Sequence, residues 1–364
     1  MTRARQRRQQ WKEQANLLEV FSSHAEKEQY NNWHRLKWRS MGTNFREYSG
    51  VVRERFADRS FKYAAMYTGL DLFNSINFSI TSRYPPGTNI FSRDWDLAIV
   101  LDACRVDCIA AVASEYDFIG DVSAVWSVGS SSHEWTTQTF SREYLDEVRG
   151  TAFLSANPFS HRTLVRGHTP PYRSVCPFGS FAWDPVSADD LSYYEQVTNE
   201  GMDCETVPPS KITDRLISVG RADDYQRVVA HYFQPHQPFL KPGEDPMEVS
   251  ELMYHHPMEM YDRGELSYDE LWEAQLDALR TVLDCIEVLL SNFEAENVVI
   301  TADHGQLLGE FGVTGHPGGL PAPQIKRTPW IETTAADEET YTPRAEADRS
   351  TDVPEERLKN LGYV

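Results

Sequence analysis

The sequence lacks the cysteine pattern of a zinc cluster or of a disulfide-stapled fold. Its five cysteines are an odd and widely scattered set, and no two of them form a CxxC pair. Long apolar runs are missing too. No stretch approaches the roughly 18 apolar residues of a membrane-spanning helix, and the N-terminus has no apolar core of a secretory signal. A cytoplasmic location is therefore expected by default.

Positive charge is scarce. The 364 residues include 55 Asp and Glu but only 35 Lys and Arg, which gives a formal net charge of -20. Such an excess repels nucleic acid and anionic lipid, so neither is an expected partner of the chain as a whole. Concentrated salt screens the self-repulsion of an acidic protein. The composition therefore predicts a salt-loving archaeal source.

The first part of the chain differs from the rest. Residues 1–90 are expected to form a helical extension and residues 91–364 the main domain, with the turn-rich SRYPPGTN at 82–89 between them. The extension opens on the basic run MTRARQRRQQWK. Two interpretations stay open for this run: a solvated helical segment packed on the domain, or a docking segment for an anionic membrane surface or an acidic protein.

Short apolar runs then alternate with amphipathic stretches. Strands are expected at 96–102, at 123–131, at 151–159, from 226 onward and at 297–305, and helices at 103–116, 133–148, 210–220 and 268–293. Continuous apolar strands separated by helices are typical of a parallel sheet that is covered on both faces. The predicted fold class is therefore α/β, with three layers and a central, mostly parallel sheet.

Polar residues follow several of these strands. Asp102 ends the first strand, Ser130–Ser132 end the second, His236 follows the fourth, and Asp303 and His304 end the last. In open parallel sheets a ligand binds beyond the carboxyl ends of the strands. We therefore expect these side chains to meet at one site.

The sequence Asp303-His304-Gly305 points to a divalent metal. A carboxylate and an imidazole at the end of a buried strand are costly to desolvate without a partner, and both are ligands for Mg, Mn, Ca or Zn. Gly305 is expected to let the backbone turn so that its neighbours aim at one point. Asp102 alone is ambiguous, because an Asp in this position also serves as a helix N-cap without any catalytic role.

The run Gly129-Ser-Ser-Ser before a predicted helix has two interpretations. Ser131 or Ser132 could be an N-cap. Alternatively, one of them is a nucleophile near a helix N-terminus, where free N–H groups favour a phosphate or sulfate. A hydroxyl beside a metal loses its proton more readily, so a serine needs no histidine base there. His236 and His316, each on a stiff or glycine-rich loop, are candidate acids for the leaving group, although single histidines are more often without function.

These motifs, taken in order, resemble the sulfatase branch of the alkaline phosphatase superfamily. They are IVLDACR at 99–105, the serine cluster, HYFQPHQPF at 231–239, ITADHGQLLGE at 300–310, GHPGG at 315–319, RTPWI at 327–331 and the terminal RLKNLGYV. The last three are similar to sulfatase-like proteins of salt-loving archaea. The resemblance implies an alkaline-phosphatase-like sandwich with one divalent metal held by Asp102, Asp303 and His304. It places the nucleophile at Ser131 or Ser132.

The resemblance also gives roles to three further residues. His236 and His316 correspond to residues that contact the ester or protonate its leaving group. Arg105 is a candidate contact for the anion, although a salt bridge at the start of the helix explains it equally well. The Cys/Ser-x-Pro-Ser-Arg motif that directs formylglycine formation is missing, so no formylglycine is expected. A second metal is not expected either, because only Glu251 and His255 approach the spacing that two-metal members use.

Two functions follow from these observations. The first is a metal-dependent hydrolase or transferase that acts on a phosphate or sulfate ester of a small molecule or glycan through a serine nucleophile. The second is a non-catalytic relative that keeps the fold and acts as a binding or scaffold component in surface-glycan metabolism. The missing formylglycine motif and the basic N-terminus favour the second. The sequence indicates neither the substrate nor the oligomeric state.

Overall fold

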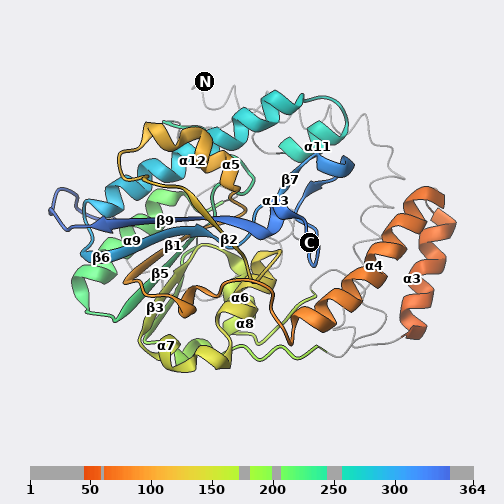
Figure 1. Cartoon of the computed structure of the whole chain (residues 1–364), viewed down its shortest axis with the longest axis horizontal. Helices are drawn as coiled ribbons and strands as arrows, with labels where there is room; N and C mark the ends of the chain where they lie inside the picture. The colour runs from red at the N-terminus through yellow and green to blue at the C-terminus, as the bar shows by residue number, and fades with distance from the viewer. Residues whose placement is uncertain (1–44, 59–60, 172–180, 199–205, 244–255, 345–364) are drawn as a thin grey trace, which may run out of the picture. The chain divides into compact units, whose positions relative to one another are not determined.

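A seven-stranded sheet forms the centre of the described structure (Figure 1). In spatial order its strands are β2 (Ser123–Trp126), β9 (Arg327–Ala335), β6 (Ala295–Ala302), β1 (Leu97–Leu101), β5 (Arg227–Tyr232), β3 (Thr151–Ser155) and β4 (Tyr193–Gln196). The computed structural model describes residues 45–58, 61–171, 181–198, 206–243 and 256–344. All of them belong to one unit, Thr43–Tyr363.

Five neighbouring strands of the sheet, from β6 to β4, run parallel to one another. β9 is antiparallel to both β6 and β2, so β2 points in the same direction as the parallel strands. The central strand β1 has the sequence LAIVL, and all five of its residues are buried, as expected for a strand covered on both faces. The carboxyl ends of β1, β2, β5 and β6 therefore lie at the same edge of the sheet.

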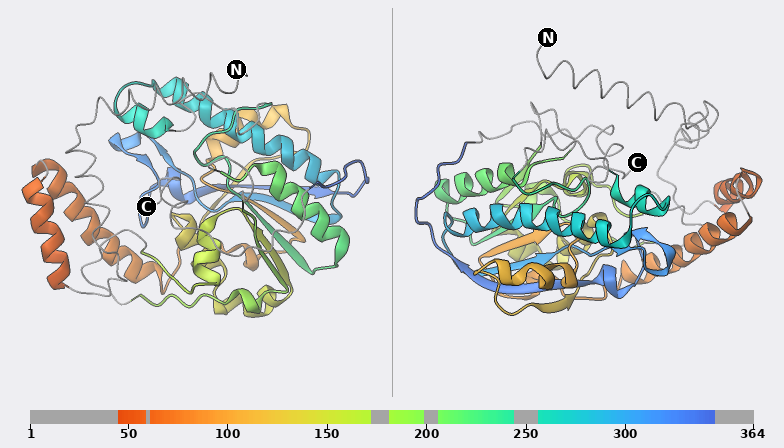
Figure 2. Two further views of the ribbon diagram at one scale, coloured as in Figure 1. Left: turned by 180° about the vertical axis from the view of Figure 1, so that it is seen from behind. Right: turned by 90° about the horizontal axis from the view of Figure 1, so that it is seen from above.

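Helices cover both faces of the sheet (Figures 1 and 2). One face carries α5 (Val106–Val112), α9 (Pro209–Ala222) and α12 (Tyr268–Leu290), and the other carries α6 (Ser132–Thr139), α7 (Leu145–Arg149) and α8 (Pro158–Leu164). α12 packs against α9 and α5, and α6 packs against α8. The predicted three-layer α/β arrangement with a mostly parallel sheet is confirmed.

Local sequence explains where the longest of these helices begins. Ser267 and Glu270 form a capping box at the start of α12, in which each side chain accepts a hydrogen bond from the backbone N–H of the other residue. Apolar residues then recur every three or four positions and are buried against the sheet. Three of them, Leu271, Ala274 and Ala278, belong to one apolar cluster. A larger cluster, which contains Trp135 and Phe153, packs on residues of the central strands.

The remaining described elements lie outside the three layers. The helices α11 (Pro257–Asp262) and α13 (Pro323–Lys326) and the strand pair β7 (Leu307–Leu308) and β8 (Thr314–Gly315) surround the loop that follows β6, and short 3-10 turns connect other elements.

Two helices precede the sheet, in the segment predicted to be a helical extension: α3 (Phe45–Asp58) and α4 (Phe61–Thr81). Arg55 and Asp71, which are both buried, join the two helices through an ion pair of 2.8 Å. The basic run at 1–12 lies outside the described residues, as do Glu251 and His255. No described helix combines the length and apolar character needed to cross a membrane.

Candidate metal and ester site

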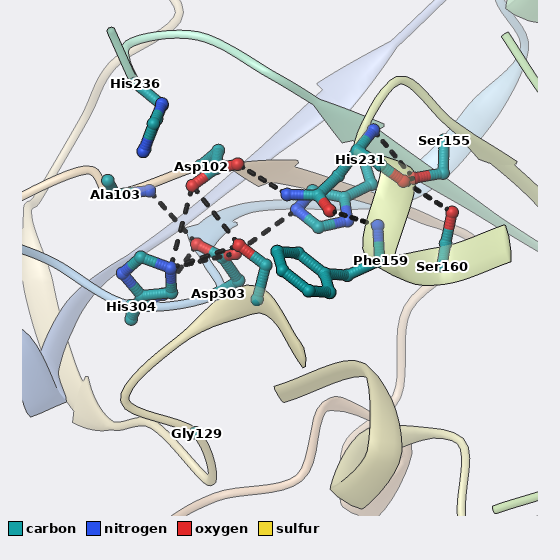
Figure 3. Close-up of polar contacts among 12 residues, drawn as sticks. Asp102, Ala103, Gly129, Ser155, Phe159, Ser160, His231, His236, Asp303 and His304 are labelled. Carbon is teal, nitrogen blue, oxygen red and sulfur yellow. Dashed lines mark hydrogen bonds and ion pairs between the residues drawn. The ribbon is translucent and has the colours of Figure 1, made fainter. Parts of the chain in front are cut away.

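Two buried aspartates meet at the carboxyl edge of the sheet. Asp102 follows β1 and Asp303 follows β6, and these neighbouring parallel strands end in register, with Leu101 opposite Ala302. Both side chains are completely buried. With His231 of β5 they form a group whose ligand atoms all lie within 4.8 Å of one another (Figure 3). The strand-end rule thus brings together the carboxylates that the sequence singled out.

His304 faces both carboxylates with one ring nitrogen. Its Nε2 lies 3.6 Å from Oδ1 of Asp102 and 3.4 Å from Oδ2 of Asp303. Its Nδ1 lies 2.8 Å from the carbonyl oxygen of Gly305. Because a carbonyl oxygen only accepts, Nδ1 carries the hydrogen and Nε2 of the neutral ring presents its lone pair to the carboxylates. Burial lowers the pKa of His304 and disfavours the imidazolium, although Asp303 opposes this shift.

His231 was not singled out from the sequence as a ligand. It lies in β5 beside Val100 of β1, and its Nε2 is 3.4 Å from Oδ2 of Asp303. In Figure 3, His231 and His304 reach the Asp303 carboxylate from opposite sides. One signal could have found it: an imidazole is the exception in the otherwise apolar run VVAHYF, and such a group needs a partner when it is buried.

The cluster leaves polar atoms without hydrogen bonds. Oδ1 of Asp303 accepts from the backbone N–H groups of Ala103 and His304. By contrast, Oδ2 of Asp303 and both ring nitrogens of His231 have no hydrogen-bond partner among the described residues. Burial raises the pKa of Asp303, but His304 and His231 outweigh it and hold this pKa below the ordinary value. Ionised oxygens and imidazole lone pairs that converge in this way fit a divalent cation.

The backbone at this edge is shaped around the cluster. Ala103 adopts a left-handed conformation with φ of 58°, which is uncommon for a residue with a side chain and occurs mostly at constrained sites. A Cβ on Gly305 would lie 2.2 Å from the carbonyl oxygen of Gln324. Gly305 is not among the described glycines with positive φ, so the turn itself does not require a glycine. The glycine instead permits a close approach between two loops.

Asn157 holds the second oxygen of Asp102. Its Nδ2 donates to Oδ2 of Asp102 at 2.6 Å, and its own Oδ1 accepts from the N–H of Phe159 at the start of α8. The side chain therefore has a fixed orientation. Asn157 was not expected from the sequence, although it follows β3 at the same edge of the sheet as the other site residues.

Replacing Asn157 by alanine is expected to weaken metal binding by about 10- to 100-fold, since partners that orient a ligand contribute that much in metal sites. Titration of the chelator-treated variant with Mn²⁺ or Zn²⁺ measures the change. The substitution Asn297→Ala, whose exposed side chain donates to Asp96 at the other end of β6, is the control and should leave metal affinity within about twofold of wild type, below the range for such partners. Equal affinity in all three proteins would show that Asn157 does not orient a ligand.

The structure separates the two candidate serines. Ser131 is the N-cap of α6, and its Oγ accepts from the N–H of Glu134. Ser132 is completely buried, and its Oγ lies 3.2 Å from Nε2 of His304 and 3.5 Å from Oδ1 of Asp102. The capping role and the position beside the carboxylates thus belong to different residues.

Residues of α4 also help to hold the serine loop, residues 129–132, in place. Oε2 of Glu134 accepts from both the N–H and the hydroxyl of Ser130, while its Oε1 accepts from Thr81 at the end of α4. Asn77 donates to the carbonyl oxygen of Gly319, whose N–H in turn donates to Ser130. The second helix of the predicted extension therefore contacts the main domain at the candidate site.

His236 and His316 form a pair beside the cluster. Their Nε2 atoms are 3.2 Å apart, and the ring of His316 lies 4.3 Å from that of His304, measured between centroids. Burial lowers the pKa of His236 to about 4 and that of His316 well below its ordinary value. Both rings are therefore neutral at pH 7 as long as no anion lies beside them.

Arg105 is engaged by carboxylates. Its Nη2 lies 2.6 Å from Oδ2 of Asp107, and its Nη1 lies 2.6 Å from Oε1 of Glu310. A further bond from Nη1 to the carbonyl oxygen of Gln306 ties the start of α5 to the loop after β6. The sequence left two interpretations open for Arg105, an anion contact and a salt bridge at the helix start. The structure shows the salt bridge.

No family model matches the chain, and no curated protein matches it in sequence. Among solved structures, the C-terminal periplasmic domain of phosphoethanolamine transferase EptC from Campylobacter jejuni is similar, with 13% identity, a TM-score of 0.37 and coverage of 65% of this chain and 77% of that one. The soluble domain of lipooligosaccharide phosphoethanolamine transferase A from Neisseria meningitidis has 14% identity, a TM-score of 0.41 and coverage of 65% and 75%.

A protein in the alkaline phosphatase superfamily from Vibrio parahaemolyticus is also similar, with 12% identity, a TM-score of 0.34 and coverage of 80% of this chain and 74% of that one. At these identities and TM-scores, the chemistry of the site follows only from the site's own residues.

Proposed function

We propose that the protein is a metal-dependent enzyme that hydrolyses or transfers phosphate or sulfate ester groups, with Ser132 as the nucleophile. One observation carries the proposal. The buried hydroxyl of Ser132 lies beside Nε2 of His304 and Oδ1 of Asp102, next to the Asp303 oxygen that has no hydrogen-bond partner in the described part of the chain. This is the arrangement that a cation and an activated hydroxyl require.

Asp102, Asp303 and His304 would hold one divalent cation, and His231 would add a second imidazole. Bound there, a divalent cation supplies positive charge that favours the ionised form of a neighbouring hydroxyl and offsets the charge of the ester. Two carboxylates with two imidazoles suit Zn²⁺ or Mn²⁺ better than Ca²⁺ or Mg²⁺, which prefer oxygen ligands throughout.

In the proposed reaction the Ser132 hydroxyl gives up its proton to solvent. Its oxygen then forms a bond to phosphorus or sulfur while the bond to the leaving oxygen breaks. Water in a hydrolase, or an acceptor hydroxyl in a transferase, later attacks the serine ester and restores the hydroxyl. The N-terminal end of α6 faces the ester in this scheme, and its dipole favours negative charge.

The pair His236 and His316 would protonate the leaving oxygen. Burial keeps both imidazoles neutral, and an anionic ester beside them raises their pKa values by direct attraction. The pair can therefore take up a proton together with the substrate and donate it when the ester bond breaks. Ser131 and Arg105 stay outside this scheme, because the first caps α6 and the second pairs with Asp107 and Glu310.

The experiment that tests the function is an ester panel with defined metals. The chelator-treated protein is assayed in high salt with p-nitrophenyl phosphate, bis-p-nitrophenyl phosphate and p-nitrophenyl sulfate, without metal and with Zn²⁺, Mn²⁺, Mg²⁺ or Ca²⁺. Turnover that depends on one of these metals is expected. A wild-type protein that binds metal but cleaves none of the three esters would support the non-catalytic, scaffold alternative instead.

A further inference from the structure

A buried lysine that the scheme above does not use lies close to the site. Lys326 is the last residue of α13, and only 3% of its surface is exposed. Its ammonium group makes no hydrogen bond or ion pair with any residue that the structure describes. An isolated buried charge is costly, and buried charges in proteins are usually paired. An anionic ligand would supply such a partner here.

The backbone of Lys326 joins the two loops that carry the site. Its carbonyl oxygen accepts from the N–H of Ser127, which precedes the serine run, at 2.6 Å. The hydroxyl of Ser127 donates to the carbonyl oxygen of Asp303. The preceding residue, Ile325, accepts from the N–H of Gly305 at 2.7 Å. The backbone of Lys326 is thus fixed between the loop that carries Ser132 and the loop that carries Asp303 and His304.

Lys326 interacts electrostatically with residues of the site. Its positive charge contributes to lowering the pKa of His304, and the Glu134 carboxylate in turn favours the charged form of Lys326. Burial lowers the pKa of Lys326 to about 8, and the Glu134 carboxylate opposes this shift. At pH 7 the side chain is therefore still mainly a cation, which suits an anion ligand rather than a general base.

Glu134 does not satisfy this cation. Its two carboxylate oxygens accept three hydrogen bonds, two from Ser130 and one from Thr81. No ion pair joins it to Lys326 among the described residues. The carboxylate therefore shapes the serine loop and leaves the ammonium group without a direct partner.

We propose that Lys326 binds a non-bridging oxygen of the phosphate or sulfate group of the substrate and is a catalytic residue of this site. The inference rests on the proposed function for the position of the ester. A fixed cation that contacts oxygens on which charge builds up in the transition state favours that state over the free ester. It also adds to the preference of the site for an anionic group.

Two variants separate this role from a general effect of charge. Lys326→Met removes the cation and keeps a similar side-chain length, whereas Arg327→Gln removes the exposed positive charge of the next residue. Binding of sodium sulfate is measured by calorimetry on the full-length, metal-loaded proteins at pH 7 and constant ionic strength. We expect affinity to fall at least about tenfold in Lys326→Met and to stay within about twofold of wild type in Arg327→Gln.

Kinetics give the second readout. The kcat/KM of Lys326→Met for p-nitrophenyl phosphate should fall about 100-fold, as when a single oxyanion donor is removed. Lys326→Arg, which keeps the charge, should recover part of both binding and rate. If Lys326→Met bound sulfate and turned over ester like the wild type, the proposal would be wrong.

The outcomes also distinguish this inference from the proposed function. Sulfate binding that depends on Lys326, in a protein that cleaves no ester, would keep the anion site and reject the enzyme. Full activity in Lys326→Met would keep the enzyme and reject the anion site at Lys326. Should Lys326→Met fail to fold, Lys326→Gln takes its place in both measurements. Sulfate affinity and turnover like those of wild type in that variant, or no saturable sulfate binding by wild type at all, overturn the proposal.

Discussion

Replacing Asp303 by asparagine is expected to remove the bound divalent metal and to lower kcat/KM at least about 1,000-fold, which corresponds to about 4 kcal/mol of transition-state stabilisation. The amide has nearly the shape of the carboxylate but no negative charge, so the oxygen that has no hydrogen-bond partner in the cluster loses its attraction for a cation. Metal content after dialysis and turnover of p-nitrophenyl phosphate measure the two losses.

A metal titration of thermal stability checks the same prediction without any substrate. A cation that binds only the folded state at 100 times its dissociation constant stabilises it by about 2.7 kcal/mol. Chelator should therefore lower the Tm of wild type but not that of Asp303→Asn. The control Asp277→Asn, which breaks an ion pair with Arg280 on α12, should behave as wild type. An Asp303→Asn protein with full metal content would remove the basis of the proposed function.

Replacing Ser132 by alanine should lower kcat by about 10,000-fold or more, as expected when the attacking atom itself is removed. The metal ligands are unchanged, so the variant should bind the same amount of metal as wild type. It should also fail to accumulate a phosphoserine. Mass spectrometry of acid-quenched protein, taken during turnover, detects this intermediate in wild type.

Ser131→Ala is the matched control, because the neighbouring serine has a different role. This change removes the hydrogen bond to the N–H of Glu134 and should cost about 1 kcal/mol of stability as a lost N-cap. Its rate should fall much less than that of Ser132→Ala. The reverse pattern, with a dead Ser131→Ala and an active Ser132→Ala, would assign the nucleophile to Ser131.

The outline of the fold could be predicted from the sequence because it depends on local patterns. Continuous apolar runs such as Leu97–Leu101 indicated buried parallel strands, and the period of apolar residues indicated α12. β9 was not expected. It contains Pro329, which lacks an N–H for the sheet, and yet it lies between β2 and β6. Only its two neighbouring strands explain why this segment is extended.

The candidate site could be predicted in part for the same reason. Asp102 and Asp303 follow strong strands, so the strand-end rule was enough to bring them together. For His231 the sequence offered one signal, an imidazole in an apolar run, and for Asn157 only its place after a strand. The importance of both residues comes from contacts with residues more than 50 positions away. Arg105 illustrates the converse: its position suggested either an anion contact or a salt bridge at the start of the helix, and the folded chain shows ion pairs with Asp107 and Glu310.

By itself, the order of residues determined the α/β class and the set of polar groups that end its strands, because both follow from apolar periodicity along the chain. The tertiary structure alone decided which serine faces the carboxylates, which nitrogen of His304 is free to bind, and that the ammonium group of Lys326 has no hydrogen-bond or ion-pair partner among the described residues. These properties depend on the direction of each side chain and on its burial. Both are set by packing between segments that are distant in sequence.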